Sequence, residues 1–151
     1  MRARDLAGAI VGRMTAITPY LLCEDVAAQL DFLARAFGFE EVLRFAADDG
    51  TINHAEMRLG DATIMLGDPG ADFRNPAALG AATVLIHVDV EDADALHERA
   101  VAAGAQIDQP PANQKYGARR FDAHDPEGHA WSFSHPLRDV APQDWGATLP
   151  G

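Results

Sequence analysis

The sequence predicts a single α+β domain made of two βαβββ modules that follow one another along the chain. Two helical patterns both begin after an aspartate and end at a glycine, with the aspartates 67 positions apart and the glycines 66 apart. One extended run precedes each pattern, and three more follow it. The chain has 151 residues, 48% of them apolar, which is enough for one hydrophobic core.

The first module is predicted over residues 16–67. An extended run at 17–23 leads to Asp25, whose side chain can serve as a helix N-cap. Apolar residues then recur at helical spacing up to Phe37, and Gly38 stands where a helix commonly ends. Three extended segments follow at 39–45, 52–59 and 62–66, with turns at Asp49-Gly50 and Gly60-Asp61.

The second module repeats this order over residues 82–135. Its first extended run spans 83–90, Asp92 can cap the helix, and Gly104 ends it. Further extended segments are predicted at 105–109, 119–124 and 129–135, the last two joined by the turn Asp125-Pro126-Glu127-Gly128. The Gly- and Pro-rich stretch 67–81 is predicted to link the modules, so that residues 15–136 form one domain.

Two short tails flank this domain. Residues 1–14 are too broken in hydrophobicity for a signal segment and are predicted to form a flexible leader. Residues 137–151 contain prolines and one large apolar side chain, Trp145. We expect this C-terminal tail to strap across the domain or across a partner subunit.

Composition excludes several classes of function. The formal net charge is −11, from 23 acidic and 12 basic residues, which argues against a nucleic acid or an anionic membrane surface as partner. A stretch of 18 or so unbroken apolar residues, which a membrane span needs, is missing from the sequence. The single cysteine, Cys23, excludes an intramolecular disulfide and a cysteine-cluster zinc site, and it indicates a reducing, cytoplasmic location. Cys23 itself is interpreted as a buried apolar side chain.

Alternation along the strands assigns residues to faces. His54, Glu56 and Arg58 share the face directed away from the helix, and a two-residue turn at Gly60-Asp61 would place Glu56 opposite Met65. In the second module, alternation turns three further residues away from the helices: Leu85, His87 and Asp89. Pairing of His124 with His129 would put Phe121 opposite Ser132, with Arg119 on the same face, whereas Trp131 and Phe133 would lie in the core. The result is a sheet with an apolar side under two helices and a titratable side opposite.

These residues resemble the vicinal oxygen chelate superfamily, which includes glyoxalase I, bleomycin-resistance proteins and extradiol dioxygenases. The resemblance rests on the doubled module and on the segments EDV…FLARAFGFE, EDADALHERAVAAGA, GDATIMLGDP and YGARRFDAHDPEGHAWSF. The hairpin NHAEMRLGDATIMLGD is most similar to the phosphonate-operon-associated, glyoxalase-like branch. The resemblance implies a curled, eight-stranded mixed sheet that forms an incomplete barrel around a cavity, with helices outside, in a homodimer.

The resemblance also identifies four positions at which the metal enzymes of this superfamily bind a divalent ion. They are occupied here by Thr18, Met65, Leu85 and Ser132. None is a good ligand for zinc, nickel, iron or manganese. We therefore expect no metal and no other cofactor, as in the bleomycin-resistance branch, which binds its drug by shape and stacking.

His54, Glu56 and His87 allow alternatives that the sequence leaves open. A displaced metal site built from these three would suit a metal-dependent lyase, isomerase or dioxygenase. Without a metal, Glu56 is a candidate general base with His54 or His87 as the acid, so Glu56 and His87 are the candidate catalytic residues. The plain alternative is that they are hydrogen-bonded groups in a wet groove, with Glu56 paired to Arg58 or Arg119.

The expected function is binding of a small aromatic or anionic molecule in the cavity. Tyr20, Tyr116 and Phe121 could offer flat faces to a ring, and Arg119 could hold an anionic group. Each also has a purely structural interpretation: barrel filling for the rings and surface ion pairing for the basic cluster, above all for Arg120. The candidate ligand-binding residues are Tyr20, His54, Arg58, Met65, Asp89, Tyr116, Arg119, Phe121 and Ser132. A homodimer with a purely structural role is the remaining hypothesis.

Overall fold

The computed structural model describes residues 15–151, so the leader predicted at 1–14 lies outside the described residues. The first module contains β1 (Tyr20–Leu22), α2 (Val26–Phe37), β2 (Glu40–Ala46), β3 (Ile52–Leu59) and β4 (Ala62–Gly67). The second contains β5 (Leu85–Asp89), α4 (Ala93–Ala102), β6 (Gln106–Asn113), β7 (Ala118–His124) and β8 (Ala130–Pro136). The linker carries a short helix, α3 (Pro76–Leu79), and the C-terminal tail a 3-10 turn, η1 (Pro142–Trp145). The predicted βαβββ order is confirmed in both modules.

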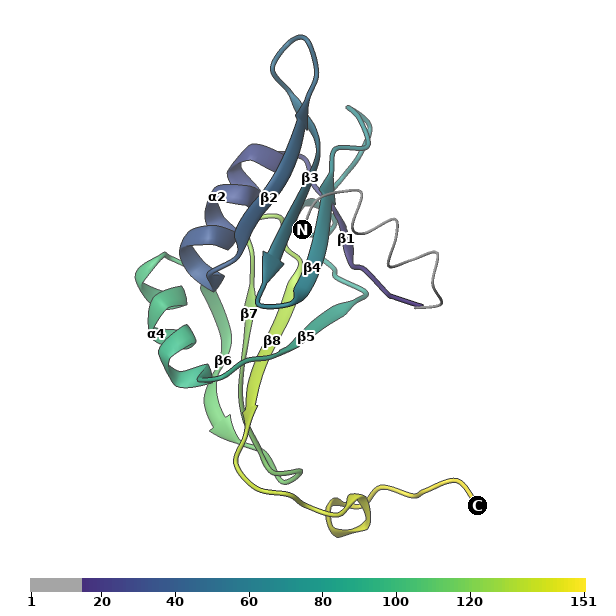
Figure 1. Ribbon diagram of the computed structural model, residues 1–151, viewed down its shortest axis with the longest axis vertical. Coiled ribbons are helices and arrows are strands. Elements are labelled where there is room, and N and C mark those ends of the chain that lie inside the picture. Colours follow the sequence, from purple (N-terminus) through teal and green to yellow (C-terminus); the bar gives the residue numbers. More distant parts are fainter. Residues whose placement is uncertain (1–14) are drawn as a thin grey trace.

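The eight strands form two four-stranded mixed sheets (Figure 1). The strand order is β1-β4-β3-β2 in the first sheet and β5-β8-β7-β6 in the second. In each sheet the first strand runs parallel to the last strand of its module, and the other neighbours are antiparallel. The α+β fold with two repeated modules is therefore confirmed, with the strands hydrogen-bonded as two sheets of four.

Both long helices begin at the predicted aspartates. The Asp25 carboxylate accepts a hydrogen bond from the Ala28 backbone N–H, and the Asp92 carboxylate accepts one from Ala95 N–H. Each side chain thus satisfies one of the amide groups that a helix N-terminus leaves without an internal partner. Gly38 ends α2 with a φ of 79°, a left-handed conformation that glycine adopts without strain.

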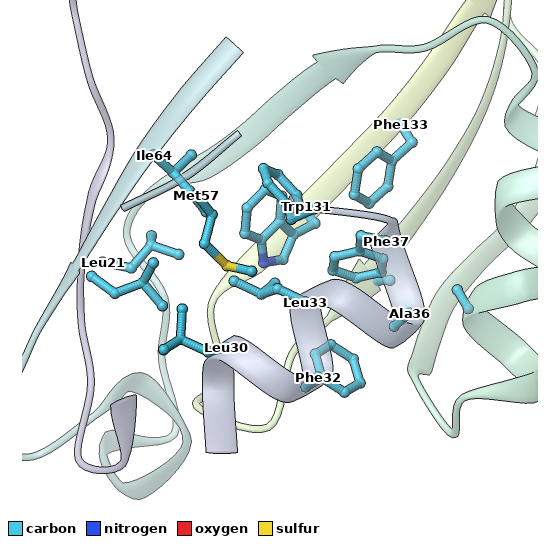
Figure 2. Packing of buried hydrophobic residues seen from close by; sticks show 14 of the residues in the cluster. Leu21, Leu30, Phe32, Leu33, Ala36, Phe37, Met57, Ile64, Trp131 and Phe133 are labelled. Carbon is cyan, nitrogen blue, oxygen red and sulfur yellow. The ribbon is translucent and has the colours of Figure 1, made fainter. Parts of the chain in front are cut away.

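The hydrophobic core lies between the helices and the sheets, and α2 connects the two modules (Figure 2). Phe37 at the end of α2 is fully buried, with its ring centroid 4.7 Å from that of Phe133 and 5.5 Å from that of Trp131, both on β8. Arg99 of α4 adds polar contacts, because its guanidinium donates to the backbone carbonyls of Ala34 and Arg35. The first helix therefore packs on both sheets, and the two modules share one hydrophobic core.

Two buried carboxylates in the turn between β7 and β8 also join the modules. Asp125 accepts hydrogen bonds from Gln29 Nε2 at 2.7 Å and from Trp131 Nε1 at 2.8 Å. Glu127 accepts from the backbone N–H of Glu24, just before α2, and from Asn75 Nδ2 at 3.1 Å. A buried carboxylate needs such donors because burial removes its hydration. The Asp-Pro-x-Gly turn of the second module thus holds the start of α2 in the first.

The register of the β7–β8 hairpin corrects one prediction. His124 pairs with Ala130, not with His129, because the Asp125 N–H donates to the His129 carbonyl and draws His129 into the turn. Phe121 consequently pairs with Phe133. A shift of one residue turns every side chain of a strand to the other face, so Phe121 and Arg119 lie on the helix side and not on the predicted cavity face.

Within residues 15–151, no helix is both long enough and apolar enough to cross a membrane.

Candidate functional site

The helix-free face of the first sheet presents Tyr20, His54, Glu56 and Met65 together. Glu56 pairs with Met65 across β3 and β4, as the two-residue turn predicts, and Tyr20 pairs with Met65 across β1 and β4. The intervening residues Ala55 and Met57 are fully buried under α2. The sequence therefore assigned this face correctly, including the position of Glu56 opposite Met65.

Three of these residues form a hydrogen-bonded chain. The Tyr20 hydroxyl lies 2.7 Å from His54 Nδ1, and His54 Nε2 lies 3.4 Å from Glu56 Oε1. The side chain of Glu56 is 15% exposed, whereas Tyr20 at the other end is 49% exposed. The chain thus leads from a nearly buried carboxylate to a phenol that solvent can reach.

Gly67 on β4 provides the space for this arrangement. It pairs with His54 on β3 and Leu22 on β1, so it lies between the strands that carry the histidine and the tyrosine. A Cβ atom at Gly67 would lie 2.6 Å from Cε1 of the Tyr20 ring, closer than atoms normally approach. The Tyr20 ring therefore crosses β4 directly over Gly67 to reach His54, which the sequence did not predict.

The helix-free face of the second sheet has a different polar cluster, centred on His87. Its Nδ1 lies 3.0 Å from the Ser132 hydroxyl, and its Nε2 lies 3.3 Å from both Asp89 Oδ1 and the Ser134 hydroxyl. Ser132 is fully buried, so the serine–histidine–aspartate contact does not present its hydroxyl to solvent. The cluster is suited to hydrogen bonding through His87 and Asp89, not to nucleophilic attack by Ser132.

An Arg120–Asp122 ion pair lies beside His87 on the same face. It confirms the ion-pairing interpretation of Arg120, although neither residue was among the candidate site residues. Asp122 pairs with Ser132 and Arg120 with Ser134, and their side chains meet at 2.8 Å. The hydrogen bonds that the Arg120 guanidinium donates, to Asp122 first and then to Tyr116, raise its pKa. The internal repeat could have revealed Asp122, because it stands 66 positions after Glu56, the spacing of the two helix-ending glycines.

Four predicted site residues lie elsewhere or have other partners. Phe121 is buried with its ring stacked on Phe133. Arg119 donates to both carboxylate oxygens of Asp94 at the start of α4, at 2.8 and 2.9 Å. On the first sheet, Arg58 pairs with Glu40, and Tyr116 in the β6–β7 turn packs edge-on against Trp145. The register of the β7–β8 hairpin shows that the predicted face was wrong for Arg119 and Phe121. Arg58 and Tyr116 border the two polar faces.

The donor chemistry of the four metal positions does not fit a divalent ion. Thr18 and Met65 belong to the first module, and Leu85 and Ser132 to the second. They offer two hydroxyls, a thioether and a hydrocarbon where such a site needs imidazoles and carboxylates. Among residues 15–151, no group of three or more histidine, cysteine or acidic side chains is placed to hold a metal. His54 and Glu56 lie on one sheet and His87 on the other, so one chain does not assemble the displaced site.

Large apolar side chains are also exposed on these faces. Phe45, which pairs with His54, is 62% exposed, and Leu85 on β5 is 48% exposed. By contrast, a hollow of about 580 Å³ lies beside the linker and the β7–β8 turn, and a second of about 300 Å³ lies between α2 and α4. Neither hollow is lined by Tyr20, Glu56 or His87. In a single chain the polar faces thus expose apolar side chains, and neither of these two hollows lies on them.

Cys23 at the end of the first extended run is fully buried, as predicted. Burial, followed by the nearby carboxylates Glu127 and Asp125, raises the pKa of its thiol far above the ordinary range. We expect the native protein not to react with a disulfide reagent at about pH 8, and its one thiol to react once urea unfolds the chain. The folded state favours the protonated thiol, so burial of Cys23 contributes to the stability of the native state below the ordinary thiol pKa. This contribution is lost as the pH rises above that value. Rapid labelling without urea would contradict this assignment.

A duplicated βαβββ module, with helices on one side of its sheets and polar, partly exposed faces on the other, defines the class of this protein. Residues 13–133 match the Glyoxalase/Bleomycin resistance protein/Dioxygenase superfamily, and the chain belongs to that superfamily. The resemblance inferred from the sequence is therefore confirmed at this level.

Relatives and solved structures agree with this membership. The chain is 37% identical over 130 residues to the uncharacterised protein Mb0911c of Mycobacterium bovis, covering 83% of this chain and 86% of that protein. It is 32% identical to TioX from Micromonospora sp. ML1, with a TM-score of 0.67 over 84% of this chain and 100% of TioX. A glyoxalase/bleomycin resistance protein/dioxygenase from Nocardioides is 19% identical, with a TM-score of 0.64 over 99% of this chain and 100% of that chain. The last similarity shows the fold alone.

Proposed function

We propose that this protein binds a small aromatic or anionic molecule on its helix-free sheet faces, without the metal that is usual in its superfamily. The observation that supports this most strongly is the set of side chains on those faces. Tyr20, His54 and Glu56 form a partly exposed hydrogen-bonding group beside Met65, the position at which the superfamily's metal enzymes carry a ligand. A flat molecule can stack on such a surface and satisfy its polar groups there.

We further propose that a second copy of the chain covers these faces in a homodimer. A ligand-binding site normally buries most of its ligand, and a single chain leaves both faces open. The exposed rings and aliphatic side chains of Tyr20, Phe45 and Leu85 are the kind of surface that dimerisation removes from water. The site would then combine the polar face of one chain with residues of the other.

The metal-dependent alternative needs His87 to approach His54 and Glu56. These residues lie on different sheets of one chain, so the alternative also requires a second copy. Membership of the phosphonate-operon-associated branch, a role in antibiotic resistance and a cytoplasmic location stay predictions from the sequence.

Two fluorescent probes test the proposed binding site: anilinonaphthalene sulfonate, which is aromatic and anionic, and β-naphthol, which is aromatic and neutral. We expect saturable binding of at least one of them to untagged protein. The Met65→Glu variant, which places a charge on the contact surface, should weaken that binding roughly tenfold or more. The fold is expected to persist because Met65 is only partly buried.

The matched control is Leu79→Ala, which removes an exposed apolar side chain on α3, away from both faces. It should bind the probe as the unmodified protein does. Equal affinity in the Met65→Glu variant would contradict the site. A single-chain mass by light scattering would contradict the homodimer, and one equivalent of tightly bound divalent metal in elemental analysis would contradict the metal-free proposal.

A further inference from the structure

We infer that the Tyr20–His54–Glu56 chain makes the first face a surface of hydrogen-bond acceptors, which selects a flat ligand that carries an N–H or O–H donor. This inference rests on the proposed function and narrows its ligand class. It follows from which atoms along the chain can carry a hydrogen.

The direction of the chain is determined at its inner end. An ionised carboxylate has no hydrogen to donate, so in the His54–Glu56 contact the imidazole must be the donor. His54 Nε2 therefore carries a hydrogen. In a neutral imidazole the other nitrogen, Nδ1, then has a lone pair and accepts.

The Tyr20 hydroxyl, 2.7 Å from that lone pair, is consequently the donor to His54 Nδ1. The single hydroxyl hydrogen of Tyr20 is used in the hydrogen bond to His54. The oxygen still has lone pairs that can accept a hydrogen bond from another partner. Tyr20 is half exposed, so these lone pairs are accessible to a ligand. The second oxygen of Glu56, next to Met65, is a further acceptor on the same face.

The surroundings explain why the ligand should be flat. Gly67 lets the Tyr20 ring lie across β4, and the His54 contact holds it there with the two ring centroids 5.5 Å apart. Met65 and the exposed ring of Phe45 extend the apolar surface on either side of Glu56 and His54. A planar ligand with a donor at its edge can cover Met65 and reach the Tyr20 oxygen at the same time. A purely anionic ligand would meet acceptors between Tyr20 and Glu56, because the nearby guanidinium of Arg58 is paired with Glu40.

The tautomer of His54 tests the direction of the chain without any ligand. Long-range nitrogen–proton NMR spectra at about pH 8, where an ordinary histidine is neutral, should show His54 with its hydrogen on Nε2. The His54→Gln variant identifies the resonance. In Glu56→Gln the amide can either donate or accept, so this preference should weaken. A His54 ring with its hydrogen on Nδ1 in the unmodified protein would overturn the inference.

The selectivity is tested with β-naphthol and its methyl ether, in which a methyl group replaces the donor hydrogen. We expect β-naphthol to bind about three- to tenfold more tightly, the range of one net hydrogen bond. Tyr20→Phe removes the acceptor oxygen but keeps the ring, so the preference for β-naphthol should decrease, while His54 Nδ1 and Glu56 remain as acceptors. Thr148→Val, which removes a hydroxyl from the exposed tail, should keep the preference.

The outcomes of these experiments distinguish failure of the donor selectivity from failure of the proposed ligand-binding function. Equal binding of both probes, with both weakened by Met65→Glu, would overturn the donor selectivity and leave the binding face intact. Binding of neither these probes nor anilinonaphthalene sulfonate would overturn the proposed function and, with it, the inference. A preference for the ether would also contradict it.

Discussion

Replacement of Phe37 by alanine is expected to lower the free energy of unfolding by about 3–5 kcal/mol, the range for deletion of a fully buried phenylalanine. Phe37 is inaccessible to solvent and contacts Phe32 of its own helix as well as Trp131 and Phe133 of the second sheet. Its removal would leave a cavity where the two modules meet. Urea denaturation followed by circular dichroism measures the loss.

The control for this prediction is Leu79→Ala, which truncates an apolar side chain at an exposed position outside the proposed contact faces and should alter the free energy of unfolding by about 1 kcal/mol or less. Should Phe37→Ala prove too unstable to fold, Phe37→Leu retains most of the volume and is expected to cost roughly 1–2 kcal/mol. Equal stabilities of Phe37→Ala and Leu79→Ala would contradict the central position of Phe37 in the core.

Replacement of Asp125 by alanine is expected to cost about 2–6 kcal/mol, because it leaves two buried donors without an acceptor, at roughly 1–3 kcal/mol each. Gln29 Nε2, Trp131 Nε1 and the His129 N–H all donate to this carboxylate. The first two belong to side chains that are almost completely buried, so water cannot readily replace the lost acceptor. The same denaturation measurement applies, and Trp131 fluorescence should report the lost bond.

Asp139→Ala is the matched control, because Asp139 is exposed in the C-terminal tail. It removes the same charge and should change stability by less than about 0.5 kcal/mol. A comparable loss in both variants would mean that net charge, not the buried hydrogen bonds of Asp125, determines the effect.

The two turns explain why sequence reasoning succeeded for one hairpin and failed for the other. Gly60-Asp61 forms a two-residue connection, which allows one pairing, and Glu56 accordingly lies opposite Met65. The turn from Asp125 to Gly128 is longer, and the buried bonds of Asp125 determine where the ladder begins. Phe121 and Arg119 were assigned to the wrong face because the bond from Asp125 N–H to the His129 carbonyl takes His129 into the turn and shifts the register by one residue. Of the side chains that donate to Asp125, Gln29 alone lies far away in the sequence.

In the candidate site, too, part of the arrangement could be predicted from the sequence and part could not. Alternation along β3 was enough to place His54 and Glu56 on one face, because side chains of a strand point alternately to either side. The Tyr20–His54 bond depends on β1 pairing with β4, strands separated by the whole module. The role of Gly67 depends on the same pairing. Spacing along the chain contains no signal for either.

The sequence by itself determined the duplicated βαβββ order, both helix caps, the core position of Trp131 and Phe133, and the superfamily, because these follow from local periodicity and motif. Tertiary structure alone decided which polar groups share a surface. It placed Arg120 and Asp122 beside His87, directed Arg119 to Asp94, and separated His87 from His54 and Glu56. The physical reason is that register and sheet packing depend on long-range hydrogen bonds and burial, which a shift of one residue reverses.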